Sequence, residues 1–479
     1  MTQEQDRYIS PFSTRYASDE MQGLFSARHR AELWRRLWII LAESEMELGL
    51  PVTKAQVEEL KAHATDIDFE RQAQYEKELR HDVMSHIRTY ADQCPLAAPI
   101  IHLGATSCYV GDNSDILIIR DALLLVRARL IEALRALYAF AERYADLPTL
   151  AYTHFQPAQP TTVGKRATLW MNDLVLDIEA CEQLLSTLRP LGCKGTTGTQ
   201  ASFLELFDGD YEKVKALDQR ICRKMGFTGG VPVSGQTYSR KTDAQVLSLL
   251  AQIGVSAHKF AADVRLLAHE KELEEPFEKQ QVGSSAMAYK RNPMRCERMT
   301  ALSRYLIANV QNGYMTAAEQ WLERTLDDSA NRRVSLSEGF LCADAVLALY
   351  LNVASGLVVN ERVIERNLRD ELPFMATENL LMDAVRAGGD RQKLHEKIRR
   401  YSLEASRRIK QEGQPGDLLE ALAADPDFPL TQERIDSLLR PELYIGCAGA
   451  QTRDFLRETV APLLAKYQDL QVKEKTIEV

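Results

Sequence analysis

The sequence predicts an all-α protein of three helical domains, of which the central one is a bundle of long helices. In the middle of the chain, apolar side chains recur three or four residues apart over long stretches, as in helices buried on one face. No alternating, strand-like segments separate these stretches, which favours a bundle over a doubly wound sheet. A chain of 479 residues is also too long for one compact core, so we expect two or three domains.

The first domain is assigned to residues 1–111. Pro51, Pro95, Pro99 and Gly104 interrupt this region, and such residues end or break helices. We therefore expect helices here that are shorter than those of the middle of the chain.

The central domain is assigned to residues 112–364. In residues 115–140 the apolar stripe consists of Ile116, Ile119, Leu123, Val126, Leu130, Leu134 and Leu137. The same spacing recurs in residues 243–268, where Asp243 is placed to cap the helix N-terminus. Three further segments with this pattern are 161–189, 297–322 and 335–358. Five long helices are thus expected to form the bundle.

The third domain is assigned to residues 365–479. Gly388-Gly389, Pro415-Gly416 and the prolines at 426 and 429 separate short amphipathic runs in this region. A smaller helical domain is expected.

The composition is typical of a soluble globular protein. Charged residues make up 27% and apolar residues 45%, and the net charge is -9. This acidic balance argues against a general affinity for nucleic acid or membrane surfaces, so we expect neither as a partner. The apolar stretches at 37–42 and 348–359 are well short of the roughly 20 residues that a bilayer requires. Residues 1–12 lack a basic region followed by an apolar run, which favours a cytoplasmic location.

The eight cysteines predict free thiols. They form no CxxC pair and no Cys/His ligand spacing, which fits a reducing compartment. The sequence also has no HxxxH with carboxylates and no GxGxxG after a strand. We expect neither a metal ion nor a redox cofactor.

Residues 283–299, GSSAMAYKRNPMRCERM, are the most informative segment of the chain. A glycine followed by two serines gives a pliable backbone with two hydroxyl groups. Lys290 and Asn292 are spaced to hold an anionic oxygen close to these hydroxyls, as chemistry that passes through an enolate-like anion requires. The alternative is an ordinary polar loop, with Asn292-Pro293 as its turn and Met294 in the first turn of a helix.

This segment resembles the signature of the fumarase/aspartase superfamily. The matching residues are Gly283, Ser284, Met287, Lys290 and Asn292. Two further superfamily blocks precede it, LGATSCYVGDN at 103–113 and THFQPAQPTT at 153–162. Within the superfamily, four segments resemble the adenylosuccinate lyase family: YASDEM at 16–21, RHDVM at 80–84, KGTTGTQASF at 194–203 and ERTLDDSANRR at 323–333. The resemblance covers nearly the whole chain. One departure is Ala288, where most relatives have proline.

The resemblance implies a fumarase/aspartase-like fold and an acid/base β-elimination that needs no cofactor. The substrates would be two succinylated purine nucleotides of purine biosynthesis: adenylosuccinate, which gives AMP, and SAICAR, which gives AICAR, each with release of fumarate. It also implies a homotetramer whose active sites take loops from three subunits. Long, broadly apolar helices that one chain would struggle to cover make an oligomer plausible.

The base must remove a weakly acidic proton next to a carboxylate. By resemblance this base is Ser284, which would have to act as an alkoxide, and Lys290 and backbone amides could stabilise it. The neighbouring Ser285 is a rival, because the sequence alone does not separate two adjacent hydroxyls. A purely structural pair of loop serines bonded to the backbone is the alternative.

The acid must protonate the departing nitrogen on the opposite face. By resemblance this acid is His154, since imidazole can donate and recover a proton near neutrality. The family pattern pairs it with Glu297, which would fix its tautomer. The matching residue in the RHDVM block, His81, is expected to position the substrate and to assist proton transfer, whereas His86 is expected to be structural.

The resemblance also indicates which residues hold the substrate. Arginine suits a nucleotide phosphate because its planar fork makes two parallel hydrogen bonds. The expected substrate-binding residues are Arg15, Tyr16, Arg80, Asp82, Thr106, Ser107, Thr153, Gln236, Asn292, Arg298, Arg324, Ser329 and Arg333. Surface ion pairing is the alternative for the arginines, notably for Arg324 beside Asp327 and Asp328.

Two other functions fit the same scaffold. Argininosuccinate lyase is the nearest alternative, but its signature usually has a glutamine and two lysines where this chain has Tyr289, Lys290 and Arg291. A non-catalytic, crystallin-like protein is possible because fold does not fix function. The intact Ser284 and His154 count against that second alternative.

Overall fold

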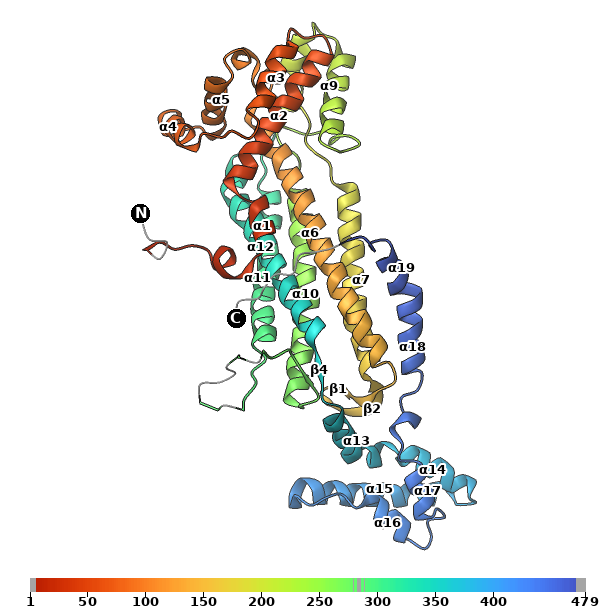
Figure 1. Ribbon diagram of the computed structural model, residues 1–479. Coiled ribbons are helices and arrows are strands. Elements are labelled where there is room, and N and C mark those ends of the chain that lie inside the picture. Colours follow the sequence, from red (N-terminus) through yellow and green to blue (C-terminus); the bar gives the residue numbers. More distant parts are fainter. Residues whose placement is uncertain (1–5, 279, 282–285, 288, 471–479) are drawn as a thin grey trace.

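The computed structural model describes residues 6–278, 280–281, 286–287 and 289–470 (Figure 1). This part of the chain is predominantly helical, which confirms the predicted fold class. Ser284, Ser285 and Ala288 lie outside the described residues.

Five long helices form the centre of the molecule. They are α6 (Ser107–Arg143), α7 (Val163–Thr187), α10 (Lys241–His269), α11 (Met294–Ala318) and α12 (Asp327–Gly356). Helix α10 packs against α7, α11 and α12, and α6 packs against α7 and α12 (Figure 1). The five helices coincide with the five predicted segments, so the predicted bundle is confirmed. Helix α11 begins at Met294, directly after the predicted Asn292-Pro293 turn.

The bundle core is built from the predicted apolar stripes. The seven stripe residues of α6 are all buried. Trp170 of α7 meets Phe260 of α10 at 5.2 Å between ring centroids, and Phe260 stacks on Tyr350 of α12 at 4.1 Å. By length and composition α12 is apolar enough to cross a membrane, but 78% of its most apolar window is buried inside the protein, as in the core helix of a bundle.

The predicted N-terminal cap of α10 is wrong. The helix begins at Lys241, and Asp243 lies inside its first turn. The buried carboxylate of Asp243 accepts hydrogen bonds from the hydroxyl of Tyr238 at 2.7 Å and from Nε of Arg332 at 2.5 Å. A buried guanidinium needs a carboxylate partner more than the exposed end of a helix does, and this partner lies too far along the chain for local sequence to reveal it.

Shorter helices surround the end of the bundle where α6 begins. They are α2 (Ala27–Glu47), α3 (Lys54–Ala62), α4 (Phe69–Leu79), α5 (Asp82–Gln93), η3 (Ala98–Ile100), α8 (Ala201–Leu206) and α9 (Tyr211–Lys224). Before them in the chain, η2 (Phe12–Tyr16) and α1 (Asp19–Leu24) lie along the bundle beside α12. Helix α2 shares a hydrophobic core with α3, α5, α8 and α9, which includes Trp38, Leu60, Tyr90 and Phe203.

A third core lies at the opposite end of the bundle (Figure 1). Its region contains α13 (Glu361–Met375), α14 (Thr377–Arg386), α15 (Arg391–Arg407), η4 (Arg408–Glu412), α16 (Leu418–Ala424), α17 (Gln432–Ser437) and η5 (Pro441–Leu443). The chain then returns along the bundle as α18 (Ala448–Phe455), η6 (Leu456–Val460) and α19 (Ala461–Ala465). Leu456 and Val460 join the bundle core.

Two short sheets, which the sequence did not predict, connect the long helices. Strands β1 (Pro148–Thr153) and β2 (Gln156–Thr162) form an antiparallel hairpin between α6 and α7. Strands β3 (Leu273–Glu274) and β4 (Val358–Val359) pair after α10 and α12. Both sheets lie at the far end of the bundle from α4 and α5 (Figure 1).

Candidate active site

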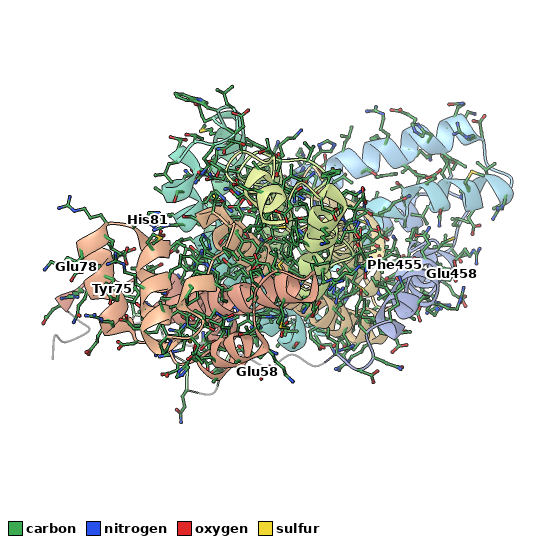
Figure 2. All side chains as sticks on the ribbon, turned by 90° about the horizontal axis from the view of Figure 1, so that it is seen from above. Glu58, Tyr75, Glu78, His81, Phe455 and Glu458 are labelled. Atoms are coloured by element: carbon green, nitrogen blue, oxygen red, sulfur yellow. The ribbon has the colours of Figure 1, made fainter. Side chains whose placement is uncertain are left out.

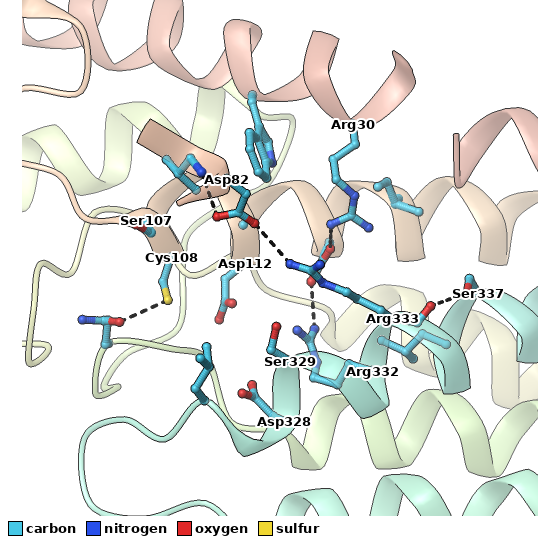
Figure 3. A pocket seen from close by; sticks show the side chains of 18 of the residues that line it. Arg30, Asp82, Ser107, Cys108, Asp112, Asp328, Ser329, Arg332, Arg333 and Ser337 are labelled. Carbon is cyan, nitrogen blue, oxygen red and sulfur yellow. Dashed lines mark hydrogen bonds and ion pairs between the residues drawn. The ribbon is translucent and has the colours of Figure 1, made fainter. Parts of the chain in front are cut away.

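A cavity of about 680 Å³ lies where α6 and α12 begin, beneath the connection between α4 and α5 (Figure 3). Many of the predicted site residues line it: Arg80, His81, Asp82, Ser107, Gln236, Arg324, Ser329 and Arg333. Thr106 is the residue that precedes the first turn of α6 and is adjacent to Ser107. The structure therefore brings together in one cavity four segments that are separate in the sequence.

The α4–α5 elbow presents three consecutive predicted residues. Arg80 ends α4 in the left-handed conformation, with φ 51°, and His81 caps α5 in an extended conformation. Nδ1 of His81 accepts the backbone N–H of Met84 at 3.2 Å. The proton of the neutral imidazole must then lie on Nε2. Seen from above the bundle, His81 lies on the side opposite Phe455 of the C-terminal helices (Figure 2).

Asp82 and Arg333 bridge this elbow to the bundle. Oδ2 of Asp82 lies 3.1 Å from Nη2 of Arg333 on α12 (Figure 3), and the side chains of Arg333 and Asp82 are 67% and 42% exposed. Two residues predicted to bind substrate are therefore bonded to each other across the cavity.

A buried cluster of ion pairs forms one wall of the cavity. Arg240 donates to both oxygens of Asp112 on α6, each at 3.0 Å, and through Nε to Asp328 of α12 at 2.6 Å. Although burial acts to lower the pKa of Arg240, the charge of Asp112 raises it above its ordinary value, so the guanidinium stays charged. Asp328 also accepts a hydrogen bond from Nη1 of Arg324 at 2.8 Å.

A second cluster continues deeper along α6 and α12. Arg332 contacts Asp243, the hydroxyl of Tyr238 and Asp115, the last at 3.0 Å. Asp115 also pairs with Arg30 of α2 at 2.9 Å. Burial acts to raise the pKa of Asp115, but Arg30 and Arg332 hold it below its ordinary value.

The cavity lining is positive although the whole chain is acidic. It contains six arginines, Arg30, Arg80, Arg240, Arg324, Arg332 and Arg333, against five acidic residues, Glu76, Asp82, Asp112, Asp115 and Asp328. The most deeply buried carboxylates are each paired with arginine. The guanidinium N–H groups that these pairs leave unused are available to an anionic ligand.

The predicted acid lies far from this cavity. His154 and Phe155 form the two-residue turn between β1 and β2, and both are left-handed, with φ 53° and 56°. Helix α6 has 37 residues and runs from the cavity to this hairpin, a length of about 55 Å at 1.5 Å per residue. Within one chain, Thr153 and His154 therefore cannot reach the substrate that His81 would bind.

The remaining predicted residues form a third group around the N-terminus of α11. Lys290 and Asn292 precede this helix, and Glu297 and Arg298 lie in its first turns. The guanidinium of Arg298 lies 5.5 Å from the ring centroid of Tyr16, next to Arg15 on η2.

The carboxylate of Glu297, predicted to orient His154, lies 4.0 Å from Arg265 instead. Among the described residues of one chain, no hydrogen bond or ion pair joins Glu297 to His154.

Several cavity residues were not found by sequence reasoning. Arg30, Asp112, Asp115, Arg240 and Arg332 all line the cavity. The available signal was weak: Asp112 lies inside the LGATSCYVGDN block, and Asp115 lies two residues after the end of that block.

Other predictions concern histidine and cysteine chemistry. His86 is packed against Trp34 at 5.1 Å, and burial lowers its pKa to about 4, which suits a structural role. Seven of the eight cysteines are buried and Cys447 is exposed, all as free thiols. Among the described residues, no group of three or more His, Cys, Asp or Glu side chains is arranged to hold a metal ion.

Comparison with known proteins agrees with this fold. A family model described as "Lyase" matches residues 13–307, so the chain is a lyase of this helical class. A second model, "Adenylosuccinate lyase C-terminus", matches residues 373–455. The chain is 50% identical over 475 residues to the adenylosuccinate lyase of Saccharomyces cerevisiae and 49% identical over 471 residues to that of Schizosaccharomyces pombe, with 98% of each chain covered in both comparisons. The chain belongs to the adenylosuccinate lyase family.

Solved structures support the fold alone. A fumarate lyase from Mesorhizobium sp. BNC1 has a TM-score of 0.78 at 23% identity, covering 93% of this chain and 99% of that one. The 3-carboxy-cis,cis-muconate lactonizing enzyme of Pseudomonas putida has a TM-score of 0.79 at 22% identity, covering 96% and 99%.

Proposed function

We propose that the protein releases fumarate from adenylosuccinate, giving AMP, and from SAICAR, giving AICAR, as a step of purine biosynthesis. The single observation that carries this proposal is the arginine-lined cavity in a chain that is half identical to adenylosuccinate lyases over nearly its full length. Such a cavity suits a ligand that carries both a phosphate and carboxylates.

The reaction breaks a carbon-nitrogen bond by removing a proton from the neighbouring carbon. Its anionic intermediate needs positioned donors. Ser107, at the N-terminus of α6, and Gln236 line the cavity, which supports a role for both in holding a succinyl carboxylate. The phosphate would lie against Arg324, Ser329 and Arg333 on the other side of the cavity.

We assign the remaining roles by the family pattern. Ser284 is the base, His154 is the acid with Glu297 as its partner, Lys290 stabilises the anion, and His81 donates through Nε2 to the substrate. The hydrogen bond from Met84 to Nδ1 of His81 supports this last role, because it leaves Nε2 to carry the proton.

We further propose a homotetramer whose active sites are shared between subunits. The proposal is supported by the separation of the predicted residues into three groups: the cavity, the β1–β2 turn and the start of α11. A length of about 55 Å between the first two groups supports the supply of His154 by another copy of the chain.

The test is ultraviolet absorbance after addition of the purified protein to adenylosuccinate, with Ser284→Ala protein and argininosuccinate as comparisons. We expect turnover of adenylosuccinate that falls by at least about 100-fold in the variant. Fumarate release from argininosuccinate alone would contradict the proposed substrate. No turnover of either compound would favour a non-catalytic scaffold.

A further inference from the structure

Arg240 occupies the centre of a four-residue chain that ends at the cavity surface. From α6 inward to the cavity, the chain runs Asp112, Arg240, Asp328 and Arg324, with contacts of 3.0, 2.6 and 2.8 Å. The side chains of Asp112, Arg240 and Asp328 are at most 5% exposed, whereas that of Arg324 is 24% exposed. Arg324 is therefore the one member of the chain that a ligand can readily touch.

We propose that Arg240 is a positioning residue that directs Arg324 toward the phosphate of the substrate. This inference rests on the proposed function, in which Arg324 binds that phosphate. Arg240 itself need not touch the substrate, because it acts through Asp328.

The two carboxylate oxygens of Asp328 are shared between two arginines. Arg240 bonds to Oδ2 of Asp328, and Arg324 bonds to Oδ1 through Nη1. A carboxylate with both oxygens free would bind an arginine with two parallel hydrogen bonds. By occupying Oδ2, Arg240 restricts Arg324 to one contact and leaves the rest of its fork for a ligand.

The backbone around Arg240 strengthens the same connection. The N–H of Tyr238 donates to Asp112 at 2.9 Å, and the N–H of Gln236 donates to the carbonyl oxygen of Glu323 at 2.9 Å. The segment before α10 thus ties α6 to the loop that carries Arg324. Arg240 fixes the side chain of Arg324 while this segment fixes its backbone.

Replacement of Arg240 by lysine is the informative change. Lysine keeps the positive charge between the two aspartates, so neither is left as an unpaired buried ion. Its single ammonium lacks the planar fork that reaches both oxygens of Asp112 and Oδ2 of Asp328 together. Oδ2 of Asp328 then becomes available to Arg324, which turns away from the cavity.

The measurement is the binding of AMP and of adenosine by isothermal titration calorimetry. The readout is the dissociation constant of adenosine divided by that of AMP, so a lower ratio means a weaker preference for AMP. This ratio reports the contacts to the phosphate, whereas a general loss of structure weakens both ligands. We expect Arg324→Ala to lower the preference for AMP by about tenfold or more. Arg240→Lys should lower it in the same direction, with little change for adenosine.

A double variant tests whether Arg240 acts through Arg324. In an Arg324→Ala background, Arg240→Lys should cause no further change in the ratio. The control is Arg35→Lys, since Arg35 is 2% exposed and is bonded to three oxygens, including Oε1 of Gln93, but does not line the cavity. This control should leave the ratio as in the wild type.

The outcomes separate this inference from the proposed function. If Arg324→Ala leaves the ratio unchanged, the assignment of the phosphate to Arg324 is wrong. If Arg324→Ala lowers the ratio but Arg240→Lys does not, or if Arg240→Lys lowers it equally without Arg324, the positioning role is overturned. Should Arg240→Lys fail to fold, Asp112→Asn loosens Arg240 from its far side and is expected to lower the ratio in the same direction.

Discussion

At the scale of single residues, the ion pairs around the cavity differ in how much they contribute to stability. The contact between Asp82 and Arg333 is exposed, and such pairs contribute at most about 1 kcal/mol. In the proposed function, a substrate phosphate would therefore replace Asp82 at Arg333 at little cost. The buried pairs of Arg240 are different, because removal of one partner leaves an uncompensated charge, at a cost of roughly 3–5 kcal/mol.

A buried glutamate outside the cavity gives a prediction about pH and stability. Glu45 of α2 is fully buried, and among the described residues neither of its carboxylate oxygens has a hydrogen-bond partner. Burial raises its pKa from 4.5 to about 9. Between these values the folded state holds a proton that the unfolded chain releases, so the free energy of unfolding falls as the pH rises.

Glu45→Gln keeps the shape and removes this titration. Relative to the wild type, the variant should gain roughly 2–3 kcal/mol in free energy of unfolding between about pH 6 and about pH 8, as measured by urea unfolding. Glu47→Gln in the same helix is the control, since Lys224 holds the pKa of Glu47 below its ordinary value and it does not titrate in this range. Parallel pH profiles for Glu45→Gln and wild type would contradict the prediction.

Local motifs reveal residues whose role depends on their own segment. His81 and Ser329 lie in recognisable blocks, and the structure places both in one cavity. Arg240 and Arg332 were not predicted as site residues, because their roles depend on partners that the fold brings in from other helices. The same reason explains why local sequence predicts a helix cap at Asp243: its arginine partner is 89 residues away.

At the scale of elements, the turn of the β1–β2 hairpin restricts which residues fit its two positions. Its two-residue turn requires positive φ at both positions, for which asparagine and glycine are the favoured residues. The chain instead has His154 and Phe155 there. Strain of this kind is often retained at functional sites, which agrees with the proposed role of His154 as the acid.

The left-handed backbone at His154 allows a substitution that removes the imidazole without disturbing the turn. His154→Asn should preserve the turn, because asparagine tolerates the left-handed conformation, and it removes the imidazole. We expect kcat to fall by about 10²–10⁴-fold with no drop in Tm. The same change at the neighbouring position, Phe155→Asn, should leave kcat near the wild-type value. Wild-type activity in His154→Asn would rule out this acid.

A close backbone contact near Arg324 supports a second prediction at this scale. A Cβ atom added at Gly235 would lie 2.4 Å from the carbonyl oxygen of Glu323 and 2.9 Å from its Cα. Gly235→Ala must therefore displace the loop that carries Arg324. We expect KM for adenylosuccinate to rise by about tenfold.

Gly229→Ala is the matched control, since nothing lies within 4 Å of its added Cβ. Equal KM values for the two alanine variants would show that the loop tolerates the displacement.

At the scale of the whole molecule, the helical bundle and many residues of the cavity were predictable, but the separation of the predicted site residues into groups was not. Periodicity alone located the five long helices, because each buries a continuous apolar face. Their lengths then determine that the ends of the bundle lie far apart, and with them His81 and His154. Sequence order carries no information on this distance, so only the structure separates the predicted site residues into groups.

Mixing of inactive variants tests the shared site. His81→Ala and His154→Ala alter different groups, so subunits exchanged between the two proteins should form some intact sites and regain part of the activity. His81→Ala and Arg324→Ala alter the same cavity, so this mixture should show no activity beyond what the Arg324→Ala protein has by itself. Recovery in both mixtures or in neither, after verified exchange, would contradict the proposed arrangement.

The distribution of thiols gives the means to verify that exchange. Because Cys447 is the exposed cysteine and the other seven are buried, a maleimide dye should attach mainly at this native position, just before α18. Two batches of the same protein can thus carry a donor and an acceptor fluorophore without any engineered residue. Energy transfer that develops after mixing would then time the rearrangement of subunits directly.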